Sequence, residues 1–137
     1  AHSPDAVARV LAAAREMTDK KVIGVLGCGG DRDSSKRSAM GQELSLRSDI
    51  SIFTSDNPRS ENPKTILEQM THGLKISEPS AIVQDRTEAI KLAVNLAQPG
   101  DVVIVLGKGH ERGQEIAGVV HPFDDRLVLA HAIEAKK

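Results

Sequence analysis

Four short apolar runs, separated by stretches of helical pattern, constrain the fold of this chain more than any other feature. The runs are KVIGVLG at 21–27, DISIF at 49–53, SAIVQ at 80–84 and DVVIVLG at 101–107. Continuously apolar runs of this length are typical of strands buried on both faces. Because parallel strands need a crossover helix between them, the alternation predicts an α/β fold: a Rossmann-like, mostly parallel sheet with helices on both faces.

A fifth run and the helical segments complete the predicted architecture. The run EIAGVVHPF at 115–123 contains Gly118 and Pro122, which suits a single antiparallel strand at the edge of the sheet. Helices are predicted near the start of the chain, at 36–47 with a break or bend near Gly41, at 63–72 with Asn62 as its cap, at 86–97, and at 124–135. No linker or repeat interrupts the pattern, so residues 1–137 are expected to form one domain.

The composition excludes several classes of function. Phe53 and Phe123 are the only aromatic residues, and the formal net charge is −1. Stacking surfaces for single-stranded nucleic acid and basic patches for DNA are therefore not expected, and neither is attraction to an anionic membrane. No apolar run approaches the length that spans a bilayer. A single cysteine, Cys28, permits no intrachain disulfide and indicates a reducing compartment.

Polar loops follow three of the predicted strands. They are GCGGDRDSSKR at 27–37, SDNPR at 55–59 and GKGHERG at 107–113. In an open α/β sheet, ligands bind beyond the carboxyl ends of the strands. We therefore expect the three loops to converge around one open pocket.

The residue types in these loops favour a small ligand with both charges. Pro58 fixes the backbone before Arg59, whose guanidinium is suited to binding a carboxylate in a bidentate manner. Lys108, His110 and Glu111 are mixed in sign, so a zwitterion such as an amino acid fits better than a plain phosphate. An ordinary turn with solvated charges remains the alternative for each loop.

Other kinds of site find no support in the sequence. The first loop lacks the dinucleotide fingerprint, because Arg32 stands where a glycine is required, and Lys36 is not followed by Ser or Thr as in a P-loop. Cys28 is expected to be a small packed residue rather than a nucleophile. The five histidines show no metal-ligand spacing, so no metal site is assigned.

Five segments together resemble the C-terminal domain of the Mur ligases. They are AHSPDAV, GCGGDRDSSKR, DNPR, DRTEAI and GDVVIVLGKGHE, and the resemblance runs from residue 1 to about residue 126. It implies a cytoplasmic, ATP-dependent ligase of peptidoglycan biosynthesis. The branch with the DNPR box adds meso-diaminopimelate to UDP-N-acetylmuramoyl-L-alanyl-D-glutamate through an acyl phosphate.

The resemblance also implies roles for particular residues. Arg59 of the DNPR box would bind the distal carboxylate that lysine lacks. The remaining implied partners of the amino acid are Arg32, Asp56, Asn57, Pro58, Gly107 and Glu111, and the implied nucleotide-side residues are His2 and Asp31. No catalytic residue and no metal ligand is assigned to this domain.

The resemblance further implies a longer parent protein. In the family, ATP and Mg²⁺ are held mainly by a central domain, and the UDP-muramoyl dipeptide is bound through domains that this chain does not contain. The chain is therefore expected to be one domain of a three-domain ligase and to be inactive alone. The alternatives are a non-catalytic Mur-like structural or interaction module, an L-lysine-adding enzyme, and a folylpolyglutamate synthase-like ligase.

Overall fold

The computed structural model describes residues 3–30, 33–107, 113–116, 119–122 and 125–136. Its helices are α1 (Pro4–Glu16), α2 (Arg37–Arg47), α3 (Pro63–Met70), α4 (Arg86–Leu96) and α5 (Asp125–Lys136). Its strands are β1 (Val22–Cys28), β2 (Ile50–Ser55), β3 (Ala81–Ile82), β4 (Val102–Leu106), β5 (Gly113–Ile116) and β6 (Val119–Pro122).

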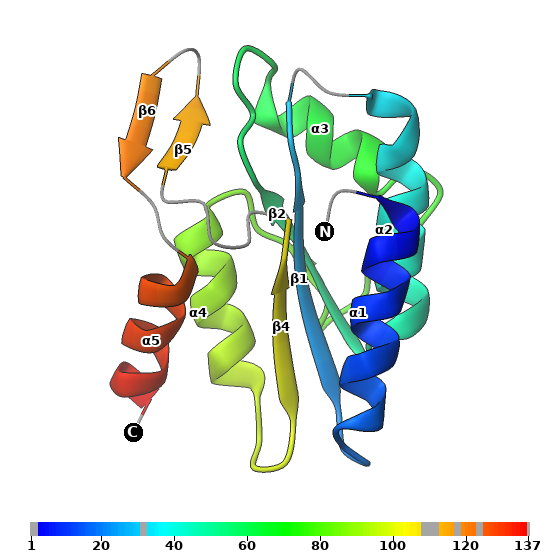
Figure 1. Cartoon of the computed structure of the whole chain (residues 1–137), viewed down its shortest axis with the longest axis vertical. Coiled ribbons are helices and arrows are strands. Elements are labelled where there is room, and N and C mark those ends of the chain that lie inside the picture. Colours follow the sequence, from blue (N-terminus) through cyan, green and yellow to red (C-terminus); the bar gives the residue numbers. More distant parts are fainter. Residues whose placement is uncertain (1–2, 31–32, 108–112, 117–118, 123–124, 137) are drawn as a thin grey trace.

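Four strands form one parallel sheet in the order β3-β2-β1-β4. In the registers of the sheet, Ile23 of β1 lies opposite Ile50 of β2 and Val103 of β4. Every residue of β1 and β2 is buried, whereas most of β4 is only partly buried because it lies at an edge of this sheet. The predicted parallel α/β architecture is confirmed (Figure 1).

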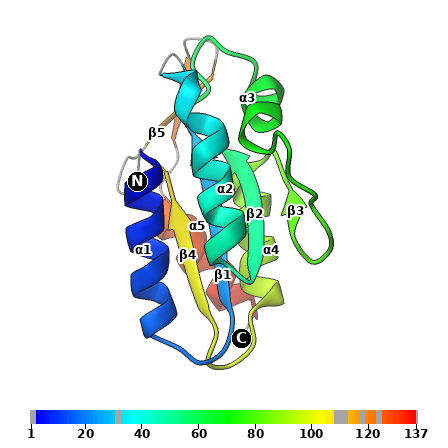
Figure 2. The same ribbon diagram turned by 90° about the vertical axis from the view of Figure 1, so that its right-hand side faces the viewer.

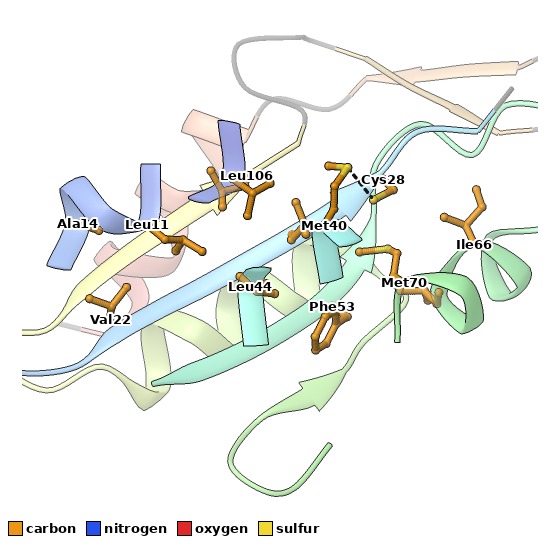
Figure 3. Packing of buried hydrophobic residues seen from close by; sticks show 13 residues of the cluster. Leu11, Ala14, Val22, Cys28, Met40, Leu44, Phe53, Ile66, Met70 and Leu106 are labelled. Carbon is orange, nitrogen blue, oxygen red and sulfur yellow. Dashed lines mark hydrogen bonds between the residues drawn. The ribbon is translucent and has the colours of Figure 1, made fainter. Parts of the chain in front are cut away.

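Helices cover both faces of the sheet (Figures 1 and 2). On one face α1, α2 and α3 pack against the strands through residues such as Leu11, Leu44 and Met70, which are fully buried (Figure 3). On the other face α4 and α5 contribute Ile90 and Ala132 to a second core. In the described part of the chain, no helix combines the length and the hydropathy needed to cross a membrane.

The helix starts agree with the signals in the sequence. Ser3 accepts a hydrogen bond from the backbone N–H of Ala6 and caps α1, with Pro4 in the first turn. Asn62 caps α3 in the same way and also precedes a proline. A capping side chain satisfies backbone donors that the helix leaves without partners. The predicted cap of the helix at Asn62 is confirmed, and the helix predicted near the start of the chain begins at Pro4.

The run 115–123 does not form the single edge strand that was predicted. Its described residues belong to β5 and β6, which pair antiparallel with each other in a separate two-stranded sheet, with Glu115 opposite Val120. Glycine within an apolar run is a turn signal as well as a weak strand residue, and in this structure one strand ends at Ile116 and the next begins at Val119. The hairpin lies at the same end of the molecule as α3 (Figure 1).

The break predicted near Gly41 is also wrong, because α2 continues through this residue from Arg37 to Arg47. A Cβ atom placed on Gly41 would lie 1.8 Å from the carbonyl oxygen of Met70, at the end of α3. The glycine therefore allows α2 and α3 to approach closely. That contact is tertiary and has no signature in the local pattern.

Candidate functional site

The carboxyl ends of β1, β2 and β4 lie at one edge of the parallel sheet. Cys28, the last residue of β1, is opposite Ser55, the last residue of β2. Leu106, the last residue of β4, is opposite Leu26 of β1. The loops that follow these strands therefore begin side by side, as the sequence predicted.

The first and second loops are joined by direct backbone contacts. The N–H of Gly30 donates to the carbonyl oxygen of Asn57 at 2.6 Å. Nη1 of Arg59 donates to the carbonyl oxygen of Gly30 at 2.9 Å and lies 3.4 Å from that of Asn57. A Cβ atom on Gly30 would lie 1.8 Å from the carbonyl oxygen of Pro58. This approach is open only to glycine, since the atom in the way belongs to the backbone.

The third loop meets the first at Gly107. This residue has φ of 108°, which L side chains rarely adopt, and a Cβ atom there would lie 2.4 Å from the carbonyl oxygen of Gly27. Glycine is thus required at this position for its conformation and for its close contact with a neighbouring backbone. Of the predicted pocket residues in the third loop, Gly107 is the one that lies within the described part of the chain.

The DNPR segment is mostly inside the protein. Asp56 and Asn57 are only 2% and 5% exposed, and Pro58 is buried, whereas Arg59 is half-buried. Arg59 also has φ of 53°, in the left-handed region that residues other than glycine seldom occupy. Such conformations persist where the surroundings enforce them, and they gather at binding sites. The loop thus presents its arginine at the edge where the three strands end.

A buried arginine, Arg37 of α2, supports the first two loops. It is 2% exposed, and its guanidinium binds both carboxylate oxygens of Glu61, at 3.0 and 2.7 Å. It also donates to the side-chain oxygen of Gln69 at 2.7 Å and to the carbonyl oxygen of Gly29 at 2.9 Å. Arg37 therefore connects the loop after β1 with α3 and with the chain just beyond Arg59.

A second buried arginine, Arg86, begins α4 and is 1% exposed. Its Nε and Nη2 donate to the two carboxylate oxygens of Asp125, each at 2.7 Å. Nη1 donates to the carbonyl oxygen of Ser55 at 2.8 Å, and Nη2 to that of Leu106 at 3.1 Å. Sequence reasoning assigned no role to Arg86 or Arg37. Charged residues at helix starts are ordinarily solvated, so the sequence contained no signal for their burial.

Cys28 is packed beneath this site and is not poised for catalysis. It is buried, and its Sγ lies 3.8 Å from Sδ of Met40 (Figure 3). Burial raises the pKa of the thiol to about 12, against a smaller lowering effect of Arg37. The thiol is therefore protonated at neutral pH, which agrees with its prediction as a small packed residue.

Several predicted site residues lie outside the described residues. They are His2, Asp31, Arg32 and Glu111. Their approach to Arg59 and Gly107 stays a prediction. Within the described ranges, no group of three or more His, Cys, Asp or Glu side chains is arranged to hold a metal ion.

This arrangement has counterparts among known proteins: a parallel sheet in which glycine-rich loops and one constrained arginine meet at the carboxyl ends of the strands. Residues 1–109 match the family described as "Mur ligase, glutamate ligase domain". The chain therefore belongs to the Mur ligase family and corresponds to the C-terminal domain of its members.

Similar proteins carry one recurring name, UDP-N-acetylmuramoyl-L-alanyl-D-glutamate–2,6-diaminopimelate ligase. The Streptomyces coelicolor protein of that name is 52% identical over 98% of this chain, and the Aquifex aeolicus protein is 48% identical over 94%. A solved structure of that name is 44% identical, with a TM-score of 0.93 over 99% of this chain. The chain spans 28% of the length of the S. coelicolor protein and 28% of the solved chain.

A more distant structure shows the fold alone. It is a domain from a putative UDP-N-acetylmuramate:L-alanyl-gamma-D-glutamyl-medo-diaminopimelate ligase of Haemophilus ducreyi. It is 15% identical, with a TM-score of 0.61 over the whole of this chain. The same architecture is thus kept at low sequence identity.

Proposed function

We propose that this chain is the amino-acid-binding domain of a longer cytoplasmic ligase. The ligase uses ATP to join meso-diaminopimelate to UDP-N-acetylmuramoyl-L-alanyl-D-glutamate in peptidoglycan biosynthesis. Support comes from relatives with the corresponding name, of which the S. coelicolor protein is 52% identical. Because this chain spans 28% of that protein, the remaining domains would bind most of the nucleotide and the muramoyl substrate.

The observation that carries the proposal is the placement of Arg59. Its backbone is in a left-handed conformation, its Nη1 is anchored on the carbonyl oxygen of Gly30, and its side chain keeps partial exposure. A guanidinium oriented in this way is preorganised to bind a carboxylate. Lysine has no second carboxylate, so a half-buried arginine favours diaminopimelate as the amino acid.

The domain's contribution to the chemistry is to orient the amine. ATP would transfer its γ-phosphoryl group to the carboxylate of the muramoyl dipeptide and leave as ADP. The neutral amine of the amino acid would then attack the acyl phosphate, forming the amide bond as phosphate leaves and the amine loses a proton. Arg59 and Arg32 would bind carboxylates of the incoming amino acid, while Glu111 would accept from an ammonium group. Orientation of this kind accounts for a large share of the rate enhancement in two-substrate reactions.

The neighbouring residues have supporting roles in this proposal. Asp56, Asn57 and Pro58 are buried, and they would shape the backbone from which Arg59 projects. Gly107 would form the wall of the pocket opposite that segment. The nucleotide-side roles of His2 and Asp31 stay predictions. Mg²⁺, like most of the nucleotide, would be held mainly by the remaining domains of the ligase.

The proposal is tested by Arg59→Ala in the full-length ligase that carries this domain. We expect kcat/KM for meso-diaminopimelate to fall about 100-fold or more, because a desolvated charge pair loses one member. The matched control is Arg47→Ala, which removes an arginine paired with Glu43 on the exposed side of α2 and should leave the kinetics unchanged.

Three results would overturn the proposal. Unchanged diaminopimelate kinetics in Arg59→Ala would remove the assigned role of this residue. Absence of ATP-dependent ligation by the folded wild-type ligase would identify the protein as a non-catalytic relative. A preference of the wild-type enzyme for L-lysine would assign it to the other branch of the family.

A further inference from the structure

Arg86 connects two strands that are not neighbours in the sheet. β1 lies between β2 and β4, yet the Arg86 guanidinium donates to the last carbonyl of each flanking strand, at Ser55 and Leu106. The next residues along the chain are Asp56 and Gly107. One side chain thus fixes how far apart the second and third loops begin.

The same guanidinium also fixes the position at which α5 begins. Asp125, the first residue of α5, binds Nε and Nη2 of Arg86. Leu106 and Asp125 flank residues 107–124, which contain the third loop with Glu111 and then the strands β5 and β6. Arg86 therefore contacts the chain immediately before the third loop and again at the first residue after residues 107–124.

Stability alone is a weak explanation for this arrangement. Both partners are buried, with side-chain exposures of 0% for Arg86 and 7% for Asp125. Buried ion pairs contribute little net stability compared with well-packed apolar residues, because both charges are desolvated. What the arginine provides is geometry, since its planar group has donors in a rigid fork that can serve four acceptor atoms at once.

We propose that Arg86, held by Asp125, is a positioning residue that sets the width of the amino-acid pocket and thereby its selectivity for a doubly carboxylated amino acid. This inference rests on the proposed function, because the pocket is the one assigned to diaminopimelate. Arg86 acts through the backbone of the second and third loops, from within the core, and does not touch the substrate.

The test is Arg86→Lys in the full-length ligase that carries this domain. Lysine keeps the positive charge next to Asp125, but a single ammonium group cannot serve both carbonyls and both carboxylate oxygens. We expect KM for meso-diaminopimelate to rise about 10-fold or more, because small displacements of binding groups have large effects on such sites. KM for ATP and for the muramoyl dipeptide should change less than about twofold, and the preference for diaminopimelate over L-lysine should decrease.

A control separates positioning from loss of stability. Ile90 lies one turn further along α4 and is fully buried in the core. Ile90→Ala should lower Tm at least as much as Arg86→Lys, because it leaves a cavity. Ile90→Ala should nevertheless leave unchanged the ratio of kcat/KM for meso-diaminopimelate to kcat/KM for L-lysine. Should Arg86→Lys not fold, Asp125→Asn is the deciding variant. It keeps the arginine, but removes the charge of its partner and one of the two acceptor oxygens that hold the guanidinium.

The outcomes distinguish this inference from the proposed function. If Arg59→Ala impairs diaminopimelate use and folded Arg86→Lys or Asp125→Asn leaves its KM unchanged, only the positioning role is refuted. The positioning role is likewise refuted if Arg86→Lys raises KM equally for all three substrates. It is also refuted if Ile90→Ala shifts the preference for diaminopimelate over L-lysine as much as Arg86→Lys does. If Arg59→Ala has no effect, the pocket assignment fails and the positioning role fails with it.

Discussion

The two ends of the parallel sheet use similar ion pairs in different surroundings. At the amino end, Arg15 binds Asp49 at 2.9 Å, and both side chains are 43% exposed. At the carboxyl end, the side chains of Arg37 and Arg86 are 2% and 0% exposed. An arginine paired with a carboxylate at the surface contributes little to stability. Breaking such a pair in the interior leaves a buried charge without its partner.

The connections at the two ends differ in the same way. At the amino end, Asp49 and Asp101 satisfy nearby backbone N–H groups: Asp49 accepts from Val22, and Asp101 accepts from Lys21 and Gln98. Most of these contacts join segments that are distant in sequence, up to 80 residues apart, and they lie near the surface. At the carboxyl end, Arg37 and Arg86 also join distant segments, but from the interior. The two ends therefore differ in the burial of their charges and not in the sequence distance that the contacts span.

The largest expected effect comes from removing a buried arginine at the carboxyl end. Arg37→Met removes hydrogen bonds to Glu61, to Gln69 and to the carbonyl oxygen of Gly29, so we expect the free energy of unfolding to fall by about 3 kcal/mol. Arg15→Met at the amino end should lower it by about 1 kcal/mol or less. Urea unfolding of both variants measures the difference, and equal losses would contradict the contrast between the two ends.

The second prediction compares two glycines with positive φ. Gly107 has φ of 108°, and a Cβ atom added there would lie 2.4 Å from a carbonyl oxygen, whereas Gly73 has φ of 79° and nothing within 4 Å of such an atom. Gly73→Ala should therefore lower stability only through backbone strain, by about 1 kcal/mol. Gly107→Ala should lower stability by about 2 kcal/mol, because the third loop must also move away from the first loop.

Thermal unfolding of the two alanine variants gives the comparison. Gly107→Ala should additionally raise KM for the amino acid in the full-length ligase. If Gly107→Ala is no more destabilising than Gly73→Ala, the close contact with Gly27 is not required for the fold.

The third prediction tests whether the carboxyl end is closed to water at Cys28. Its pKa is raised by burial from 9.0 to about 12, so the folded state keeps the proton that the unfolded state loses. The contribution of this thiol to stability is complete below about pH 9 and is lost as pH rises toward 12. The loss is about 1.4 kcal/mol at about pH 10.

The measurement for Cys28 is urea unfolding of the wild type and Cys28→Ala between about pH 8 and pH 10. The wild type should lose more stability over this range than the variant. The native thiol should also react far more slowly with a thiol reagent than the unfolded one. Parallel pH dependences would show that the thiol is accessible to solvent.

The smallest effect is expected at the amino end, from Asp101→Asn. Hydrogen bonds from the backbone N–H groups of Gln98 and Lys21 lower the pKa of the Asp101 carboxyl. A lowered pKa in the folded state stabilises the protein above the ordinary value of 3.8, and this contribution is lost as pH falls through the folded-state pKa. The variant should show a slightly lower Tm at neutral pH and no difference in strong acid. A persistent difference in acid would point to a packing effect instead.

Much of the fold was accessible from local pattern because the relevant physics is local. Continuous apolar runs predicted the strands, helical spacing predicted the helices, and capping residues such as Asn62 predicted where they begin. The carboxyl-end rule for parallel sheets then placed the loops that carry Gly30, Arg59 and Gly107 together, and the structure confirms their contact. The hairpin of β5 and β6 escaped prediction, since a glycine in an apolar run is compatible with a weak strand or with a turn.

The sequence by itself determined the class of fold, the edge of the sheet at which a ligand is proposed to bind and the family, because each depends on residue types and their order along the chain. Only the tertiary structure decided which charges are buried. Arg86 reaches Ser55 across 31 residues and Asp125 across 39, and no local pattern encodes such distances. Burial of a charge is stable only when distant partners arrive together, and that condition is met only when the whole chain has folded.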